Sequence, residues 1–278
     1  MIIAIASGKG GTGKTTVATN LALSIKDEVQ LLDCDVEEPN ADIFIQPKII
    51  SEKLVLVPVP KVNEEKCIYC GKCAAICAFN AIAVIAKKVL IYPELCHHCG
   101  ACQYFCPTRA IQEVDKEMGV VKFGNRDHLE FIQGQLNIGE VMPIPVIKEV
   151  KKHLHESKTI IIDAPPGTSC PVIESVKGCD FCILVTEPTP FGLNDLILAI
   201  EVLRKMKIPF GVIINRSDLG NQSTDDYCKN ENIPILMKIP FQKEIAIAYS
   251  KGIPLIEIMP DYKESFRQVL EKVQTILK

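Results

Sequence analysis

The chain has 278 residues, of which 47% are hydrophobic and 23% charged, and its formal net charge is -3. This composition is ordinary for a globular protein, and the length allows one large α/β domain with or without a small insert. The weak charge gives no reason to expect a nucleic-acid surface or a polybasic membrane anchor, so we expect neither nucleic acid nor membrane as a partner. No run of about 18 apolar residues is present, and the first apolar run, residues 2–6, is too short for a signal peptide.

Cysteine is the one residue type whose use is unusual. The chain has 13 cysteines and no signal for secretion, so we expect a cytoplasmic protein with reduced thiols. Many reduced thiols in one chain suggest metal binding, and their spacing distinguishes the kinds of metal site.

Short β-rich runs alternate with helical stretches at both ends of the chain. The run at 2–7 precedes an amphipathic stretch at 15–26. Further runs that end in polar residues or glycine lie at 29–35, 159–167, 181–190 and 210–218, and a helical stretch lies at 192–206. Buried strands that alternate with helices predict a doubly wound, mostly parallel α/β sheet with functional residues at the carboxyl ends of its strands.

The first turn of this predicted sheet carries a phosphate-binding motif, because residues 8–15 fit G-x4-G-K-[ST] between a strand and a helix. We expect Lys14 to reach the β- and γ-phosphates, Thr15 to bind Mg²⁺ and Thr16 to meet the α-phosphate, while backbone N–H groups surround the phosphates. The expected contacts in the loop are Gly8, Lys9, Gly10, Gly11, Thr12, Gly13, Lys14, Thr15 and Thr16.

The middle of the chain contains an internal duplication. Residues 65–85 and 94–114 align with an offset of 29 residues, and each copy reads C-x2-C-x2-C-x3-C. In bacterial two-cluster ferredoxins this spacing gives each [4Fe–4S] cluster three cysteines from one copy and the fourth from the other. We expect one cluster on Cys67, Cys70, Cys73 and Cys106, and a second on Cys96, Cys99, Cys102 and Cys77. Zinc is the alternative, although zinc sites usually use two separated cysteine pairs.

The duplication divides the chain into three predicted segments. Residues 1–60 and 116–278 form a P-loop nucleotide domain, and residues 61–115 form a small inserted α+β domain of the bacterial ferredoxin type. A strand expected at 53–59 leads into the insert.

The loop sequence KGGTGKT, with its early Lys9, resembles the deviant phosphate loop of the MinD/ParA and nitrogenase iron-protein superfamily. The resemblance covers residues 1–45 and about 155–278. It implies an Mg-dependent ATPase that holds ATP between two subunits of a homodimer. In that superfamily the early lysine crosses to the partner's phosphates, so Lys9 would act catalytically in the manner of an arginine finger. A solvated lysine that only raises the local potential is the alternative.

Two further segments resemble the switches of the same superfamily. By the match of LLDCDVEEPN, Asp35 orients or activates the attacking water and Asp33 supports the Mg²⁺ shell. By the match of IIIDAPPG, Asp163 holds Mg²⁺ through water and Gly167 senses the γ-phosphate through its N–H. The alternative is that the carboxylates only cap the helices that follow.

Residues 215–218, NRSD, are expected to hold the base through Asn215 and Arg216. The tetrapeptide resembles both the adenine-contacting segment of the superfamily and the N-K-x-D guanine signature, so ATP is implied but GTP stays open. Pro240 and Phe241 follow another expected strand and are further candidates for the base pocket.

Five cysteines lie outside the duplication. Cys170 corresponds in place to a cluster-bridging cysteine of the nitrogenase iron protein, but no second cysteine is evident, and we expect an interface or buried thiol. Cys179 and Cys182 lie in an apolar run and are expected to pack as small hydrophobes. The C-x2-C that cluster-carrier ATPases place after the asparagine strand is absent, since only Cys228 lies there; Cys34 completes the set.

These features predict an ATPase whose nucleotide-driven dimer switch is coupled to electron transfer or to metallocluster assembly and delivery. The cofactors would be ATP, Mg²⁺ and two [4Fe–4S] clusters, and the redox or metallocluster client protein is unknown. A MinD/ParA-type positioning or partition ATPase, with the insert as a structural or docking module, is the alternative. The intact set of Lys9, Lys14 and Thr15 counts against a third possibility, a structural cluster domain with a degenerate ATPase.

Overall fold

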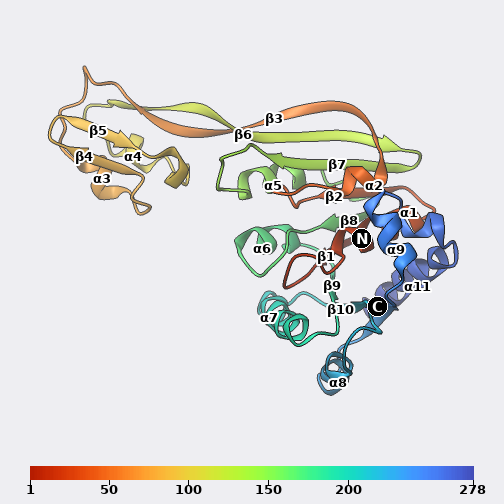
Figure 1. Cartoon of the computed structure of the whole chain (residues 1–278). Coiled ribbons are helices and arrows are strands. Elements are labelled where there is room, and N and C mark those ends of the chain that lie inside the picture. The colour runs from red at the N-terminus through yellow and green to blue at the C-terminus, as the bar shows by residue number, and fades with distance from the viewer.

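A nine-stranded sheet with the order β11-β10-β9-β1-β8-β2-β7-β6-β3 organises the computed structural model, which describes residues 1–278 (Figure 1). The strands from β11 to β7 are mutually parallel, whereas β6 and β3 at one edge run antiparallel to their neighbours. The strands of this sheet are β1 Ile2–Ala6, β2 Val29–Asp33, β3 Lys48–Val62, β6 Ile111–Arg126, β7 Leu129–Leu136, β8 Thr159–Asp163, β9 Phe181–Thr186, β10 Phe210–Asn215 and β11 Ile235–Ile239. The predicted mostly parallel α/β sheet is therefore confirmed.

Helices cover both faces of the sheet (Figure 1). The helices are α1 Lys14–Ser24, α2 Ala41–Ile45, α3 Lys72–Ile76, α4 Ala101–Tyr104, α5 Ile144–Lys151, α6 Cys170–Val176, α7 Pro190–Met206, α8 Ser223–Asn230, α9 Lys243–Ser250, α10 Leu255–Ile258 and α11 Asp261–Ile276, with a 3-10 turn at Pro93–Leu95. None of them combines the length and the apolar character needed to cross a membrane.

Two hydrophobic cores lie on opposite faces of the sheet, because successive side chains of a strand point to opposite sides. In β1, Ala4 and Ala6 join the core beneath α5, α6 and α7, whereas Ile3 and Ile5 join the core beneath α1, α10 and α11. Strand β1 is thus apolar on both faces, as expected for a strand inside a covered parallel sheet. The C-terminal helix α11 packs through Phe266, Val269 and Val273, while Ile276 is exposed.

The edge strands β3 and β6 form a long ribbon that projects from the body of the molecule (Figure 1). They pair from Lys48 with Asn125 to Val62 with Ile111. Only residues 119–126 of β6 also pair with β7, so the rest of the ribbon extends past the sheet. The sequence predicted a strand only at 53–59, where the apolar residues form a continuous run.

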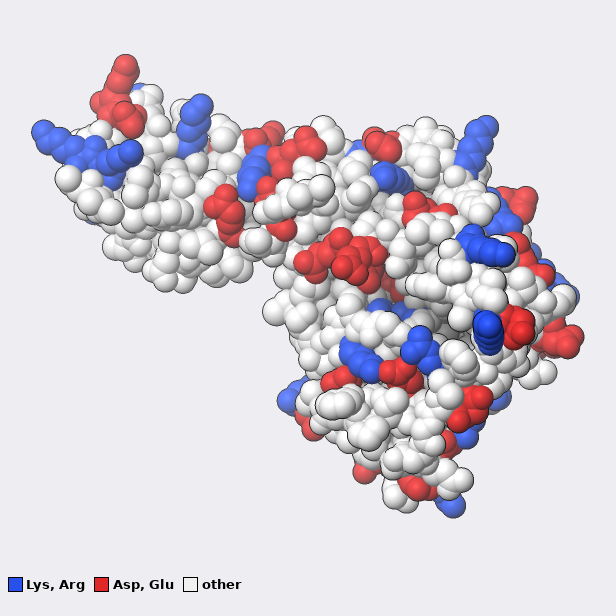
Figure 2. All heavy atoms as spheres, in the orientation of Figure 1, with Lys and Arg blue, Asp and Glu red and all other residues white.

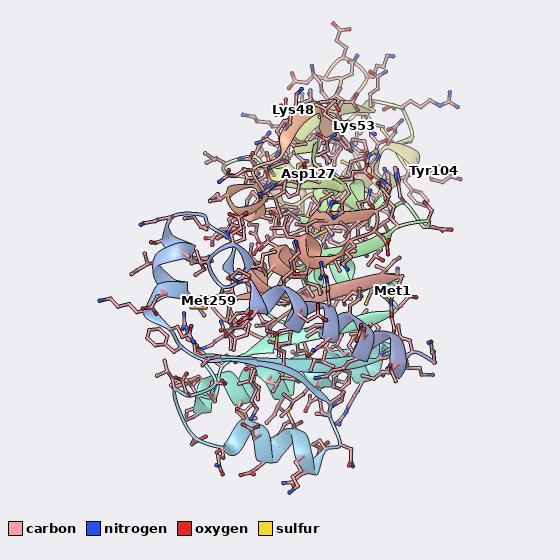
Figure 3. All side chains as sticks on the ribbon, turned by 90° about the vertical axis from the view of Figure 1, so that its right-hand side faces the viewer. Met1, Lys48, Lys53, Tyr104, Asp127 and Met259 are labelled. Carbon is pink, nitrogen blue, oxygen red and sulfur yellow. The ribbon has the colours of Figure 1, made fainter.

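The ribbon carries a head formed by residues 63–110. The head contains α3, α4 and a separate two-stranded sheet of β4 (Ile82–Ile85) and β5 (Lys88–Ile91). Tyr104 of the head is 83% exposed and projects into solvent (Figure 3). The predicted limits of the insert, 61 and 115, lie inside the paired strands, and the division into domains stays a prediction, as does the ferredoxin type of the insert.

Helix α5 fixes the base of the ribbon to the body. Val55, Val57 and Val59 of β3 belong to the same apolar core as Val146 and Val150 of α5. Beside them, Lys53 Nζ lies 2.7 Å from Glu149 Oε1, and Lys152 Nζ lies 2.8 Å from Glu149 Oε2. Lys53 is on the upper side of the view in Figure 3. The ribbon is therefore held at its base by apolar packing and an ion-pair network.

Candidate functional site

The loop between β1 and α1 has the backbone geometry of an anion cradle. Gly11 and Gly13 have φ values of 77° and 96°, in the left-handed region that favours glycine. A Cβ on Gly13 would lie 2.5 Å from Asn215 Nδ2, so this position is closed to larger residues. Helix α1 begins at Lys14 without a side-chain cap, which leaves its first N–H groups free for an anion.

Asp163 is a buried carboxylate at the end of β8, directly beside the strands that carry the loop. It lies opposite Ile5 of β1 and Asp33 of β2, and neither of its carboxylate oxygens has a hydrogen-bond partner. Burial raises the pKa of Asp163 to about 7 against the opposing charge of Lys14, which together with Thr15 is also buried. An unpartnered carboxylate near a threonine hydroxyl is a suitable environment for a hydrated Mg²⁺ ion, so these residues fit the cation.

Asp33 uses both carboxylate oxygens within the protein. Its Oδ1 accepts a bond from Asp35 N at 3.1 Å, and its Oδ2 accepts bonds from Ala41 N at 3.1 Å and from Gln133 Nε2 at 3.2 Å. Burial, followed by the charge of Asp163, raises its pKa. The contact with Ala41, the first residue of α2, is the helix-capping role named as an alternative, and a place in the Mg²⁺ shell stays a prediction.

Asp35 and Gly167 lie at the two predicted switches. Burial raises the pKa of Asp35 to about 6 and outweighs the charge of Lys14, so this carboxylate titrates close to the range useful for a general base. Gly167 N donates to Ser7 O at 2.9 Å. The predicted contact of Gly167 with a γ-phosphate would require this bond to be released, and both roles stay predictions.

Lys9 points toward the neighbouring strand end. Its Nζ lies 2.5 Å from Glu187 Oε1, and Arg216 Nη1 lies 3.0 Å from Glu187 Oε2. These residues follow β1, β9 and β10, which are adjacent in the sheet. Figure 2 shows basic and acidic side chains close together around the hollow on this face of the body. The sequence did not predict that Lys9 has a partner within its own chain.

A cavity of about 290 Å³ beside the loop is the candidate base pocket. All four residues predicted to hold the base line it: Asn215, Arg216, Pro240 and Phe241. The other lining residues include Gly11, Gly13, Thr16, Gln242 and Tyr249. Asn215 Nδ2 donates to Thr12 O at 2.9 Å, which fixes β10 to the loop. Asp218 Oδ1 accepts a bond from Phe241 N at 2.6 Å. The carboxylate that would read guanine in an N-K-x-D motif is thus bonded to the main chain.

Three residues of the site were not predicted from the sequence. Glu187 follows buried β9, the same position at a strand end that pointed to Asp33 and Asp163. Gln133 is a buried polar residue within β7, opposite Asp33 of β2, and its Nε2 also lies 3.1 Å from Asp42 Oδ1. Gln242 places a buried amide oxygen without a partner at the base pocket. A polar residue at the end of an apolar run was the available signal for the first two.

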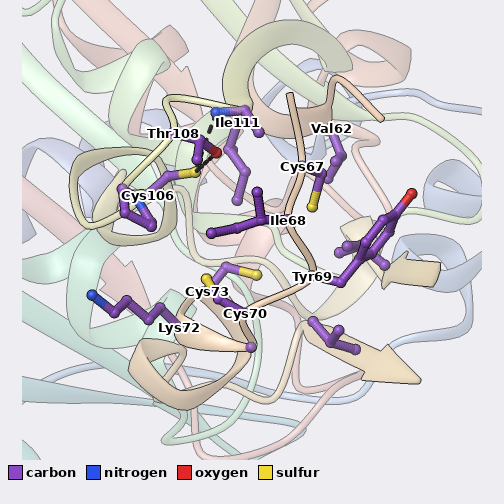
Figure 4. Close-up of a pocket in the computed structure, with 15 residues that line it drawn as sticks. Val62, Cys67, Ile68, Tyr69, Cys70, Lys72, Cys73, Cys106, Thr108 and Ile111 are labelled. Carbon is purple, nitrogen blue, oxygen red and sulfur yellow. Dashed lines mark hydrogen bonds between the residues drawn. The ribbon is translucent and has the colours of Figure 1, made fainter. Parts of the chain in front are cut away.

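The duplicated cysteines lie around two cavities in the head. One cavity is lined by Cys67, Cys70, Cys73 and Cys106, and the other by Cys77, Cys96, Cys99 and Cys102. Figure 4 shows the first set around a common space near Ile68 and Val62. No three His, Cys, Asp or Glu side chains converge closely enough to hold a single metal ion. Each cavity therefore gathers three cysteines of one copy and the fourth of the other.

The backbone repeats along with the cysteines. Tyr69 and His98 have φ values of 54° and 55°, and Gly71 and Gly100 have values of 75° and 71°. In both copies the N–H four residues after the last cysteine donates to its sulfur: Ala81 to Cys77 at 3.3 Å, and Ala110 to Cys106 at 3.2 Å. Such N–H donors favour a charged sulfur ligand, so the two loops fit groups that bind thiolates.

The other cysteines do not form a site of this kind. Cys34, Cys179, Cys182 and Cys228 are buried, and Cys179 and Cys182 belong to the apolar core, as predicted. Cys170 is exposed at the start of α6 and is not a buried thiol.

Comparisons with known proteins identify relatives over the whole length of the chain. A family model described as the CobQ/CobB/MinD/ParA nucleotide binding domain matches residues 3–255. The chain is 35% identical to an uncharacterized protein of Methanocaldococcus jannaschii, covering 100% of this chain and 98% of the relative. It is 25% identical to the iron-sulfur cluster carrier protein of Pyrococcus horikoshii, covering 99% of this chain and 86% of the relative.

Solved structures show the same architecture. The septum site-determining protein MinD of Pyrococcus horikoshii, complexed with Mg-ADP, superposes with a TM-score of 0.62 at 21% identity, over 99% of this chain and 96% of MinD. At this identity the likeness shows the fold alone. With its family match, its nucleotide-site geometry and this fold, the chain belongs to the CobQ/CobB/MinD/ParA family of nucleotide-binding domains.

Proposed function

We propose that this protein is a homodimeric, Mg-dependent ATPase that carries two [4Fe–4S] clusters and couples its nucleotide-driven dimer switch to electron transfer or cluster delivery. The observation that carries the proposal is the grouping of the cysteines, three from one copy and one from the other, around each cavity of the head. A four-iron cluster spreads its thiolate ligands farther apart than one zinc ion does. Thiols that surround a cavity without converging on one point are therefore compatible with it.

Each cluster, when bound, would supply one-electron redox chemistry, and the residues of the head set its environment. The cavity of Cys67 and its partners has mainly apolar walls, including Val62, Ile68 and Val89. The cavity of Cys96 also has His97, His98 and Glu113 in its wall. Because local charge and solvent exposure tune cluster potentials, the two clusters would have different potentials.

For hydrolysis, Lys14 and the N–H groups of the loop would bind the phosphates, and Thr15 with Asp163 would hold Mg²⁺. Asp35 would orient the attacking water, and Lys9 of a second subunit would neutralise charge that develops on the phosphates. The relatives named as iron-sulfur cluster carriers support a role in cluster delivery for this chain as well, at 25% identity for the relative from Pyrococcus horikoshii.

ATP is favoured over GTP by the contacts of the base pocket. In the N-K-x-D arrangement the aspartate accepts hydrogen bonds from guanine, but Asp218 is not among the residues that line the cavity, and its Oδ1 accepts a bond from Phe241 N. The dissociation constants of ATP and GTP, measured on the same preparation, should therefore differ. ATP should bind at least about ten times more tightly, because burying the polar edge of guanine without hydrogen-bond partners is costly.

Anaerobic purification tests the cluster proposal. We expect brown protein with about eight irons and eight sulfides per chain, which is two four-iron clusters. Cys102→Ser should lower the iron content by about half, while Cys228→Ser, at a buried cysteine outside both cavities, should not change it. Colourless protein, or protein with about one zinc per chain, would contradict the proposal.

The coupling is tested separately from the clusters. Reduction potentials and client binding should differ between protein with a non-hydrolysable ATP analogue and protein with ADP. If both are independent of nucleotide while ATP-driven dimers form, the positioning or partition type of ATPase becomes the better interpretation.

A further inference from the structure

We propose that Glu187 is a positioning residue that keeps Lys9 within its own subunit and thereby sets how readily the ATP-bound protein dimerises. The inference rests on the proposed function, in which Lys9 acts on the nucleotide of a second copy. It adds a residue that controls when Lys9 is free to contact the nucleotide of the second copy.

The contact between Glu187 and its two cations is the first observation. Each carboxylate oxygen of Glu187 serves one cation, Lys9 at 2.5 Å and Arg216 at 3.0 Å. The Glu187 side chain is only 13% exposed, whereas those of Lys9 and Arg216 are 31% and 46% exposed. Ion pairs that are partly shielded from water are stronger than fully exposed pairs. Lys9 is therefore held firmly at the side of its own phosphate loop.

Glu187 is fixed in place by its backbone. Its carbonyl oxygen accepts a bond from Thr189 N at 2.8 Å, and Thr189 Oγ1 accepts a bond from Gly192 N at 3.0 Å. A Cβ on Gly192 would lie 2.3 Å from Glu187 O, so the turn between β9 and α7 is closely packed. Lys9, by contrast, lies in a loop between Gly8 and Gly10 and has a long flexible side chain. When the pair separates, Lys9 is the partner that moves.

Lys9 cannot bind Glu187 and reach across a dimer interface at the same time. Before Lys9 can contact a partner's phosphates, the ion pair must break, and this opposes dimerisation. Arg216 reduces that opposition, because Glu187 keeps one cation when Lys9 leaves and is not left as an unpaired, mostly buried carboxylate. The phosphates of ATP, with their larger charge, would compete with Glu187 for Lys9 more effectively than those of ADP.

The test is the dimer dissociation constant, measured by sedimentation equilibrium with a non-hydrolysable ATP analogue and with ADP. Glu187→Gln keeps the size and shape of the side chain but removes its charge and one of its two acceptor oxygens. We expect this variant to dimerise about three to ten times more tightly with the ATP analogue and to behave as the unmodified protein does with ADP, since an ion pair of this kind contributes roughly 1 kcal/mol. In a Lys9→Ala background the same substitution should have no effect, because the restrained lysine is gone.

Glu231→Gln is the matched control. Glu231 pairs with Arg204 at 2.8 Å on the same domain and away from the nucleotide loop, so its loss should not alter dimerisation. A thermal melt of each variant shows whether a change comes from folding. Weaker or unchanged dimerisation of Glu187→Gln, or an equal effect in the Lys9→Ala background, would overturn the role of Glu187. If the unmodified protein itself forms no ATP-dependent dimer, it is the proposed function that fails.

Discussion

Single residues at the ends of neighbouring strands determine the chemistry of the nucleotide site. Polar residues lie at or just after the ends of four neighbouring strands: Arg216 after β10, Glu187 after β9, Asp163 at the end of β8 and Asp33 at the end of β2. The phosphate loop follows β1, between β9 and β8, and Gln133 lies within β7 opposite Asp33. The carboxyl ends of parallel strands meet at one edge of a sheet, so the fold gathers residues that lie far apart in the sequence. At this edge burial raises the pKa values of Asp33 and Asp163.

Gly13→Ala should destabilise the protein by about 1–3 kcal/mol, because alanine would be forced into a left-handed conformation and its Cβ would displace Asn215. Chemical denaturation of the ligand-free protein measures this change. Gly10→Ala is the matched control, since a Cβ on Gly10 would meet no atom within 4 Å and its φ is not positive. The stability of this control should change by less than about 0.5 kcal/mol. Equal effects of the two substitutions would contradict the explanation.

Glu113→Gln should raise the potential of one of the two clusters by tens of millivolts. Glu113 lines the cavity of Cys96 and its Oε1 lies 3.4 Å from the place of a Cβ on Gly100, so its negative charge opposes reduction of a cluster there. The size follows from a screened charge at about 6–10 Å. Potentiometric titration followed by EPR measures it.

Glu117→Gln serves as the control for this substitution, because Glu117 lies on the same strand but outside the cavity wall. A shift of both clusters, or an equal shift in the control, would show that the charge of Glu113 does not act locally.

At the scale of elements, the sequence predicted what depends on local spacing and missed what depends on tertiary pairing. The glycine and lysine positions of residues 8–15 and the cysteine spacing have meaning within one short segment, and these features led to the loop and to the two sets of cysteines that the structure brings together. The length of β3 and β6 depends on pairing between two strands that are separated in the sequence by residues 63–110. It could therefore not be predicted from the sequence of either strand alone. The contact of Lys9 with Glu187 could likewise not be predicted from the sequence, because it depends on β1 and β9 being neighbours in the sheet.

Glu149→Gln should loosen the base of the ribbon and lower the free energy of unfolding by about 1 kcal/mol at neutral pH, after allowance for solvent screening of the exposed lysines. Partial burial would raise the pKa of Glu149, but hydrogen bonds and charges from Lys152 and Lys53 outweigh it and lower the pKa to about 2.

The pH dependence of this effect has a definite sign. A depressed pKa stabilises the fold above the unfolded value of 4.5, and this contribution is lost as the pH falls toward 2. Denaturation of both proteins between pH 7 and pH 2 should therefore show the difference in stability shrinking only below about 4.5. A difference that is constant over this range would mean that the charge of Glu149 does not hold the ribbon.

At the scale of the whole molecule, one side chain joins the ribbon to the nucleotide site. Strand β7 pairs with β2 on one side and with β6 of the ribbon on the other, and Gln133 of β7 donates to both Asp33 and Asp42. A shift of the first switch would move this amide and the strand that carries it.

Gln133→Leu should reduce any effect of ATP on the cluster potentials by half or more, because the donor shared by Asp33 and Asp42 is lost. Asp33 would keep its bonds from Asp35 N and Ala41 N, but the loss of the two bonds from Gln133 should also lower stability by about 1–3 kcal/mol. Redox titrations with ATP analogue and with ADP test the coupling, and Gln135→Leu is the control, since Gln135 lies on the same strand but bonds Lys122 at an exposed site. An unchanged ATP effect in Gln133→Leu would exclude this route.

Beyond Val59, the last ribbon residue in the apolar core shared with α5, the ribbon consists of residues 60–62 of β3 paired with 111–113 of β6; these residues do not pair with β7, and they connect the body to the head. Three residues of antiparallel strand at about 3.4 Å each reach roughly 10 Å, so a tilt of about 10° beyond Val59 would move the near end of the head by about 2 Å. Because the head carries all eight cysteines of the duplication, such a tilt would shift both sets of cysteines while the packing of the body stays unchanged.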